Sequence, residues 1–264
     1  MPTPPPPITH YAAINGLHLY YEIHGSGLPL VLLHGGGSTI ESNYGKVLSE
    51  LAKTNRVIAV ELQAHGHTAD IDREMTFEQD ADDVAALLEM LQIEKANIFG
   101  FSNGGTTAIQ LAIRHPKMVN ALIPASATTK RDGMIAGFFE GMRHASFDNM
   151  PQPLIQAFQK ANPDPKGLEA MFLRDSTRMI NFQDIPDELV KTIQAPTLII
   201  NADHDVVLVE HAIELSRLIP NAELAILPGG HGHYIGEICA PGPDSVIPAL
   251  VVGLINEFLD KHSA

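Results

Sequence analysis

The chain has 264 residues, of which 45% are hydrophobic and 18% charged, and its formal net charge is −14. This length and composition predict a globular protein with a sizeable core, and no uninterrupted apolar run is long enough to cross a bilayer. The negative charge would repel nucleic acids and anionic membrane surfaces, so we expect neither as a partner.

The cysteine content and the N-terminus bear on localisation. The chain has a single cysteine, Cys239, which excludes an intramolecular disulfide framework and favours a reducing compartment. Residues 1–8 are rich in proline and lack the basic stretch and apolar core of a secretory signal, so they are predicted to be a disordered leader. We therefore expect a cytoplasmic protein, either a monomer or a homodimer.

The chain from residue 9 onward alternates strand and helix patterns. Residues 11–14 and 17–23 flank Asn15-Gly16, a dipeptide typical of a tight hairpin turn. Short apolar runs suited to strands buried on both faces then alternate with amphipathic segments, which predicts a mostly parallel sheet wrapped by helices. The runs lie at 30–33, 57–60, 97–101, 121–123, 196–200 and 222–227, and the predicted helices at 42–52, 77–91, 104–114, 209–218 and 246–261.

Residues 129–195 interrupt this alternation. They are rich in Met, Phe, Gln and Pro and offer short helices without a strong strand. We predict that they form a helical cap inserted into one α/β core domain, which comprises residues 9–128 and 196–264. Within the cap, Phe138 and Met142 are candidates for lining an acyl or aromatic pocket, because methionine and phenyl side chains adapt to apolar ligands.

The sequence Gly100-Phe101-Ser102-Asn103-Gly104-Gly105 lies between a predicted strand and a predicted helix. A serine nucleophile needs such a sharp turn, small neighbours that permit it, and a helix N-terminus that favours negative charge. Ser102 is therefore the candidate nucleophile, with Phe101 beside it as a candidate substrate contact.

An earlier strand ends in His34-Gly35-Gly36-Gly37-Ser38. Backbone N–H groups can approach an oxyanion closely where no side chains intervene, so the N–H groups of Gly36 and Asn103 are the predicted oxyanion donors. His34 and Gly35 are predicted to contact substrate. The motif lacks the residues of a phosphate-binding loop or a dinucleotide fingerprint.

A serine hydroxyl needs a base that is itself oriented by an acid. Later strands are followed by Asp203-His204-Asp205 and by His231-Gly232-His233, which gives the order Ser, Asp, His. Asp205 is favoured because it stands last before an apolar run, and His231 because it directly follows its strand. Asp203 and His233 stay open as alternatives.

These motifs together resemble the α/β-hydrolase superfamily over nearly the whole chain. The resemblance rests on the His34-Gly35 turn, the loop of residues 63–68, the Ser102 elbow, the Asp205 segment and residues 228–231. It implies an eight-stranded, mostly parallel sheet flanked by helices, with a helical cap. A serine at the elbow disfavours the dehalogenase and epoxide hydrolase branches, which use aspartate.

The expected activity is hydrolysis of a small carboxylic ester or related acyl compound through Ser102, His231 and Asp205, with no cofactor. The same residues could open lactones, hydrolyse carbon–carbon bonds or perform perhydrolysis, and some relatives are receptors with a vestigial site. Histidine clusters do not match metal-ligand spacing, so no metal is expected, and His65 and His67 are predicted to shape a loop near the rim of the site.

Overall fold

The computed structural model describes residues 8–240, 242 and 245–263, and its strands form one eight-stranded sheet. The sheet order is β1-β2-β4-β3-β5-β6-β7-β8. Residues 1–7 of the predicted leader lie outside the described residues, and Ile8 is already the first residue of β1. The strands are β1 (Ile8–Ile14), β2 (Leu17–His24), β3 (Leu28–Leu33), β4 (Asn55–Glu61), β5 (Ala96–Phe101), β6 (Val119–Ala125), β7 (Thr197–His204) and β8 (Ala222–Gly230).

The sheet is antiparallel only at its N-terminal edge. The predicted hairpin is confirmed: Asn15 and Gly16 join β1 to β2 with φ angles of 48° and 87°, the left-handed conformations that a tight turn between twisted strands requires. β2 pairs antiparallel with β4, and every later pairing is parallel. The carboxyl ends of β3 to β8 therefore point to the same edge of the sheet, where a site can be assembled from several strands.

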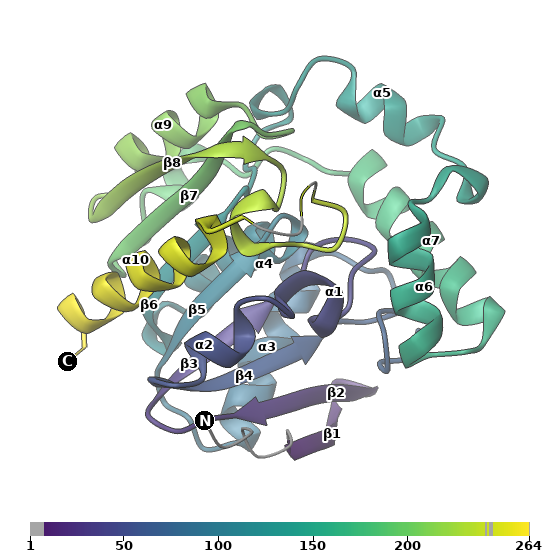
Figure 1. The fold of residues 1–264 in the computed structure, drawn as a ribbon, viewed down its shortest axis with the longest axis horizontal. Coiled ribbons are helices and arrows are strands. Elements are labelled where there is room, and N and C mark those ends of the chain that lie inside the picture. The colour runs from purple at the N-terminus through teal and green to yellow at the C-terminus, as the bar shows by residue number, and fades with distance from the viewer. Residues whose placement is uncertain (1–7, 241, 243–244, 264) are drawn as a thin grey trace.

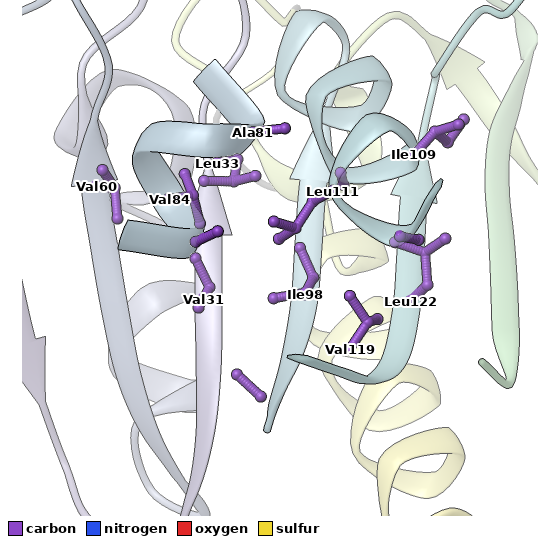
Figure 2. Packing of buried hydrophobic residues seen from close by; sticks show 14 of the residues in the cluster. Val31, Leu33, Val60, Ala81, Val84, Ile98, Ile109, Leu111, Val119 and Leu122 are labelled. Carbon is purple, nitrogen blue, oxygen red and sulfur yellow. The ribbon is translucent and has the colours of Figure 1, made fainter. Parts of the chain in front are cut away.

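Successive residues of each strand supply the two faces of the sheet. On β3, Val31 and Leu33 pack into one apolar cluster with α3, α4 and α9, whereas Leu30 and Leu32 pack into a second cluster with α1, α2 and α10. Figure 2 shows the first of these layers, in which helix side chains meet strand side chains. The helices of the two layers are α1 (Ile40–Tyr44), α2 (Leu48–Leu51), α3 (Phe77–Met90), α4 (Asn103–Arg114), α9 (Val209–Leu218) and α10 (Ile247–Lys261).

Residues 129–195, here called the cap, lie between β6 and β7 and contain no named strand. Figure 1 shows α5, α6 and α7 beyond the arrowheads of the parallel strands. Met150, Phe158, Leu168 and Met171 form an apolar cluster of the cap's own. The cap helices are α5 (Phe138–Arg143), α6 (Gln152–Ala161), α7 (Pro165–Ile180) and α8 (Asp187–Val190), and short 3-10 turns span Arg131–Gly133 and Phe147–Asn149.

One predicted helix is wrong. Residues 42–52 were expected to form a single helix, but the chain breaks between Tyr44 and Leu48 into α1 and α2. Thr39 caps α1 through a reciprocal capping box with Ser42, so the first helix starts earlier than its apolar pattern indicates. The break allows Tyr44 and Leu48 both to reach the same apolar cluster beneath the sheet.

Candidate active site

Ser102 occupies a strained turn between β5 and α4. Its φ and ψ angles are 55° and −120°, a conformation that non-glycine residues rarely adopt. The neighbouring glycines are required by space: a Cβ on Gly100 would lie 2.0 Å from the carbonyl oxygen of Gly104, and a Cβ on Gly104 would lie 2.1 Å from that of Leu33. The glycines allow the helix to approach β3 and leave the Ser102 side chain at the sheet edge.

The structure brings Ser102, His231 and Asp205 together from three different strand ends. His231 follows β8, and its Nε2 atom lies 3.1 Å from Ser102 Oγ. Its Nδ1 atom lies 2.6 Å from Oδ1 of Asp205, which directly follows β7. With the proton on Nδ1, the imidazole donates to the carboxylate and its Nε2 is free to accept the serine proton.

The two alternatives lie elsewhere. The Nε2 atom of His233 is 3.3 Å from Ser245 Oγ, in the short 3-10 turn His233–Ile235. Asp203 is exposed, and its carboxylate accepts a hydrogen bond from the Gly229 N–H at 2.8 Å. Neither residue contacts Ser102 among the contacts of the described residues.

Asp205 is held by a buried hydroxyl pair that the sequence did not reveal. Ser126 Oγ lies 2.5 Å from Asp205 Oδ2 and 2.6 Å from the hydroxyl of Tyr234, and the Val207 N–H donates to Oδ1 at 3.2 Å. Burial alone would raise the pKa of Asp205, but hydrogen bonds from His231 and Ser126 hold that pKa below its ordinary value. Asp205 is therefore kept as a carboxylate. Ser126 follows β6, at a strand end that could have drawn attention to it.

The glycine turn after β3 lies against the N-terminus of α4. A Cβ on Gly36 would be 2.6 Å from the Asn103 side-chain nitrogen, and the Gly35 N–H donates to Asn43 Oδ1 at 2.6 Å. Within the described part of the chain, the backbone N–H groups of Gly36 and Asn103 have no hydrogen-bond acceptor. Two unused donors beside Ser102 fit an oxyanion hole, and their catalytic role is a proposal below.

The other predicted substrate contacts lie at different distances from Ser102. The Phe101 ring packs 4.7 Å from the His231 ring, between centroids, at the site itself. His34 is buried, and its two ring nitrogens contact the Gly35 carbonyl at 2.8 Å and the Leu62 N–H at 3.1 Å, so it braces the turn. Its contact with substrate stays a prediction.

Phe138 and Met142 are half-buried and pack against an apolar cluster between the cap and α3. This cluster comprises Phe77, the first residue of α3, with Met179 and Phe182 of the cap. Their role in substrate binding therefore stays a prediction without a contact that supports it.

A buried charge of the cap reaches the glycine turn and was missed by sequence reasoning. Asp175 on α7 accepts the Gly37 N–H at 2.6 Å, and its Oδ2 lies 2.9 Å from His65 Nε2. Its Oδ1 accepts from Arg178 at 2.5 Å, and Arg178 also pairs with buried Asp80 at 2.6 Å. His65 was predicted to lie in a loop near the rim of the site, and it is fully buried beside the turn.

The electrostatics of this cluster follow from its pairing. Burial would raise the pKa of Asp175, but attraction to His65 and Arg178 outweighs it and holds that pKa well below its ordinary value. Burial would likewise lower the pKa of His65, yet the Asp175 carboxylate raises it. The cluster thus places the buried Asp175 carboxylate between two basic side chains, His65 and Arg178.

Two kinds of feature are absent from the described residues. No helix there is long and apolar enough to cross a membrane. No group of three or more His, Cys, Asp or Glu side chains in these parts of the chain is arranged to hold a metal ion.

Comparison with known proteins places the chain in a family. Residues 29–160 match the family model described as the alpha/beta hydrolase fold. The chain is 28% identical over 242 residues to the serine hydrolase BPHL of Homo sapiens, covering 83% of this chain and 78% of that protein. It is 31% identical over 248 residues to the AB hydrolase superfamily protein YisY of Bacillus subtilis, covering 83% and 90%.

Other relatives are named for particular substrates. The 2-hydroxymuconate semialdehyde hydrolase of Pseudomonas sp. (strain CF600) is 27% identical, covering 83% of this chain and 85% of that protein. The solved structure of the meta-cleavage product hydrolase CumD from Pseudomonas fluorescens IP01, a mutant complexed with acetates, superposes with a TM-score of 0.77 at 25% identity, covering 97% of this chain and 98% of that one. The chain belongs to the alpha/beta hydrolase fold family, and its relatives include serine hydrolases.

Proposed function

We propose that this chain is a serine hydrolase that cleaves a small carboxylic ester. The observation that carries the proposal is the hydrogen-bonded series Ser102, His231 and Asp205, with distances of 3.1 and 2.6 Å between the contacting atoms. A hydroxyl in contact with an imidazole that is itself held by a buried carboxylate is the arrangement that activates serine for acyl transfer.

The proposed reaction has two acyl-transfer steps. His231 Nε2 takes the proton of Ser102 as Oγ attacks the ester carbonyl carbon, and the N–H groups of Gly36 and Asn103 stabilise the oxyanion. The tetrahedral intermediate then expels the alcohol, which takes its proton from His231. Water repeats the sequence on the acyl-enzyme: it gives a proton to His231, attacks the carbonyl and releases the acid as Ser102 regains its proton. This chemistry requires no cofactor.

The charges around the turn favour a substrate without a free acid group there. Arg178 is the permanent cation of the buried cluster and His65 is a second one when protonated; Asp175 engages both, and Arg178 is also bound to Asp80. An anionic group placed beside the turn would meet the Asp175 carboxylate with no spare cation in this cluster, whereas a neutral ester needs none.

A second candidate is cleavage of a carbon–carbon bond beside a ketone by the same residues. It is supported by the similarity to the 2-hydroxymuconate semialdehyde hydrolase and to the meta-cleavage product hydrolase. Both candidates use a carbonyl electrophile and the same nucleophile, so they differ in the leaving group rather than in the machinery.

The test combines labelling with turnover. Purified protein is treated with a fluorophosphonate probe, and turnover is measured on p-nitrophenyl esters of graded chain length, lactones and a vinylogous 1,5-diketone, with Ser102→Ala as control. We expect a mass increase of one probe molecule on the wild type, none on the variant, and the highest kcat/KM on a short ester. A Ser102→Ala protein with full esterase activity would refute the mechanism, and preferred turnover of the diketone would establish the second candidate. Tight ligand binding with negligible turnover would instead indicate a receptor.

A further inference from the structure

We infer that Asp175, a residue of the cap, is a positioning residue that sets the geometry of the oxyanion turn. The inference rests on the proposed function, because it assigns a purpose to a contact with the predicted oxyanion-binding segment. Asp175 itself does not touch the reacting atoms in this assignment. It acts through the backbone of Gly37 and through Asn103.

One carboxylate contacts both segments that carry the unused donors. Oδ2 of Asp175 accepts the Gly37 N–H at 2.6 Å, and Oδ1 lies 3.4 Å from the side-chain nitrogen of Asn103, the first residue of α4. A Cβ on Gly36 would stand 3.1 Å from Oδ2, so the carboxylate also lies against the peptide that carries the predicted donor. Asp175 therefore lies between the glycine turn and α4.

The hydrogen bond from Gly37 to Asp175 bears on the backbone conformation of the glycine turn. Gly37 has a φ of +69°, and its N–H has Asp175 as its short-range acceptor, with His65 Nε2 at 3.3 Å. The direction of the Gly36 N–H depends on the dihedral angles of this turn. A small displacement of an oxyanion donor is costly, because catalytic hydrogen bonds require donors close to the position that the charge will occupy.

Burying the Asp175 carboxylate costs desolvation free energy, which favours a role for this residue beyond packing. Asp175 is 9% exposed and is surrounded by His65, Arg178 and, beyond Arg178, Asp80. Buried charges of this kind often contribute little net stability compared with apolar residues of similar size. An apolar residue at 175 would fill the space but would leave the Gly37 N–H without its acceptor.

The test uses Asp175→Asn, because the amide keeps the shape and loses the charge. The amide oxygen will face the cationic Arg178, which is the stronger donor, so the amide NH₂ turns toward Gly37. The Gly37 N–H then loses its short hydrogen bond and keeps only the 3.3 Å contact with His65 Nε2. The matched control is Asp70→Asn. Asp70 pairs with Arg174 at 2.9 Å, so this control weakens another ionic contact of the same helix with the core while leaving the turn untouched.

Each protein is assayed for kcat and KM on the best ester, for affinity toward an arylboronic acid, which forms a tetrahedral adduct on the serine, and for thermal unfolding. We expect Asp175→Asn to lower kcat and boronate affinity by the same factor, at least about tenfold, with KM changed less than about threefold. Asp70→Asn is expected to keep kcat within about twofold of the wild type. If Asp175→Asn does not fold, Asp175→Leu combined with Arg178→Met and Asp80→Asn is expected to show the same loss, because it removes the three paired charges together and also takes away the carboxylate that accepts the Gly37 N–H.

The inference is overturned if the folded Asp175 variant keeps kcat within about twofold, or if Asp70→Asn lowers kcat and boronate affinity equally, since cap docking alone would then explain the effect. Failure of the proposed function has a different signature. In that case Ser102→Ala retains activity in the same assay, whatever the Asp175 variants do.

Discussion

Asparagine at position 205 would remove the negative charge beside His231 while keeping the shape of the side chain. The structure also fixes which way the amide will turn. Oδ1 of Asp205 accepts the Val207 N–H at 3.2 Å and Oδ2 accepts the Ala202 N–H at 3.4 Å, so an amide NH₂ would face a backbone donor at either position. Only beside Oδ2 is there also a hydroxyl, that of Ser126, which can rotate to accept from the NH₂. The amide oxygen therefore stays toward His231, and the imidazole keeps the tautomer that leaves Nε2 free.

The magnitude follows from the lost charge alone. When His231 becomes an imidazolium, its charge and that of Asp205 are about 4 Å apart, which is worth about 4 kcal/mol at an effective dielectric constant of about 20. Each 1.36 kcal/mol changes a rate about tenfold, so Asp205→Asn should lower kcat/KM about 10³-fold. A variant that also forced the wrong tautomer would lose about 10⁴-fold.

The assay is kcat/KM on the best p-nitrophenyl ester, with Asp203→Asn as the matched control from the same loop. Asp203 is exposed and accepts only the Gly229 N–H among the described contacts, so its variant should stay within about threefold of the wild type. The reasoning fails if Asp203→Asn is the crippled variant, or if Asp205→Asn keeps more than a tenth of the activity.

Three further outcomes are expected. His231→Gln should reduce kcat at least about 10³-fold, while His233→Gln, whose histidine lies outside the serine's contacts, should stay within about threefold on the same ester. Gly104→Ala should lower the free energy of unfolding in urea by about 3 kcal/mol or more, because its Cβ would lie 2.1 Å from a carbonyl oxygen of β3. Gly253→Ala, whose Cβ would have no neighbour within 4 Å, should instead raise it by about 0.5–1 kcal/mol by stabilising α10. Burial, then the neighbouring histidine, lowers the pKa of His34 to about 3, so the unfolded chain takes up a proton below about pH 6.5 and the folded chain does not. The free energy of unfolding of the wild type should thus fall by about 2 kcal/mol because of this group between about pH 6.5 and pH 5. His34→Gln should remove that part of the pH dependence when unfolding free energy is measured against pH, and an unchanged pH dependence would contradict the assignment.

The strands and the longer helices were predictable because each has a local signal. Asn15-Gly16 specified the hairpin, and the apolar runs between turn residues marked β3 to β8. The single helix expected at 42–52 was wrong because its pattern of apolar residues continues across a break that only the packing of Tyr44 and Leu48 reveals. The apolar pattern of a segment does not indicate a helix break that depends on packing against residues distant in the sequence.

The candidate triad was predictable for a related reason. Ser102, Asp205 and His231 each follow a strand with a recognisable turn, and parallel strands deliver their carboxyl ends to one edge of the sheet. Asp175 has no such sequence signal. It lies in the middle of an amphipathic helix, 138 residues from Gly37, where an aspartate is indistinguishable from an ordinary surface residue. Its partner Arg178 lies one turn further along the helix, and this spacing is typical of an exposed ion pair.

The cap therefore differs from what its composition indicates. Its methionines and phenylalanines pack largely among themselves, with Met150 and Leu154 standing 3.5 Å from the position a Cβ on Gly37 would take. The cap also places the Asp175 carboxylate at the sheet edge, where it accepts a hydrogen bond from the glycine turn next to Ser102. If Asp175 positions that turn, withdrawal of α7 from the core breaks the Gly37 contact, so opening of the cap and loss of the oxyanion geometry are one event. Substrate enclosure and catalytic competence would then be coupled through the Asp175 carboxylate. The Asp175 and Asp70 variants, which disturb two different contacts of α7, should therefore separate docking of the cap from its effect on chemistry.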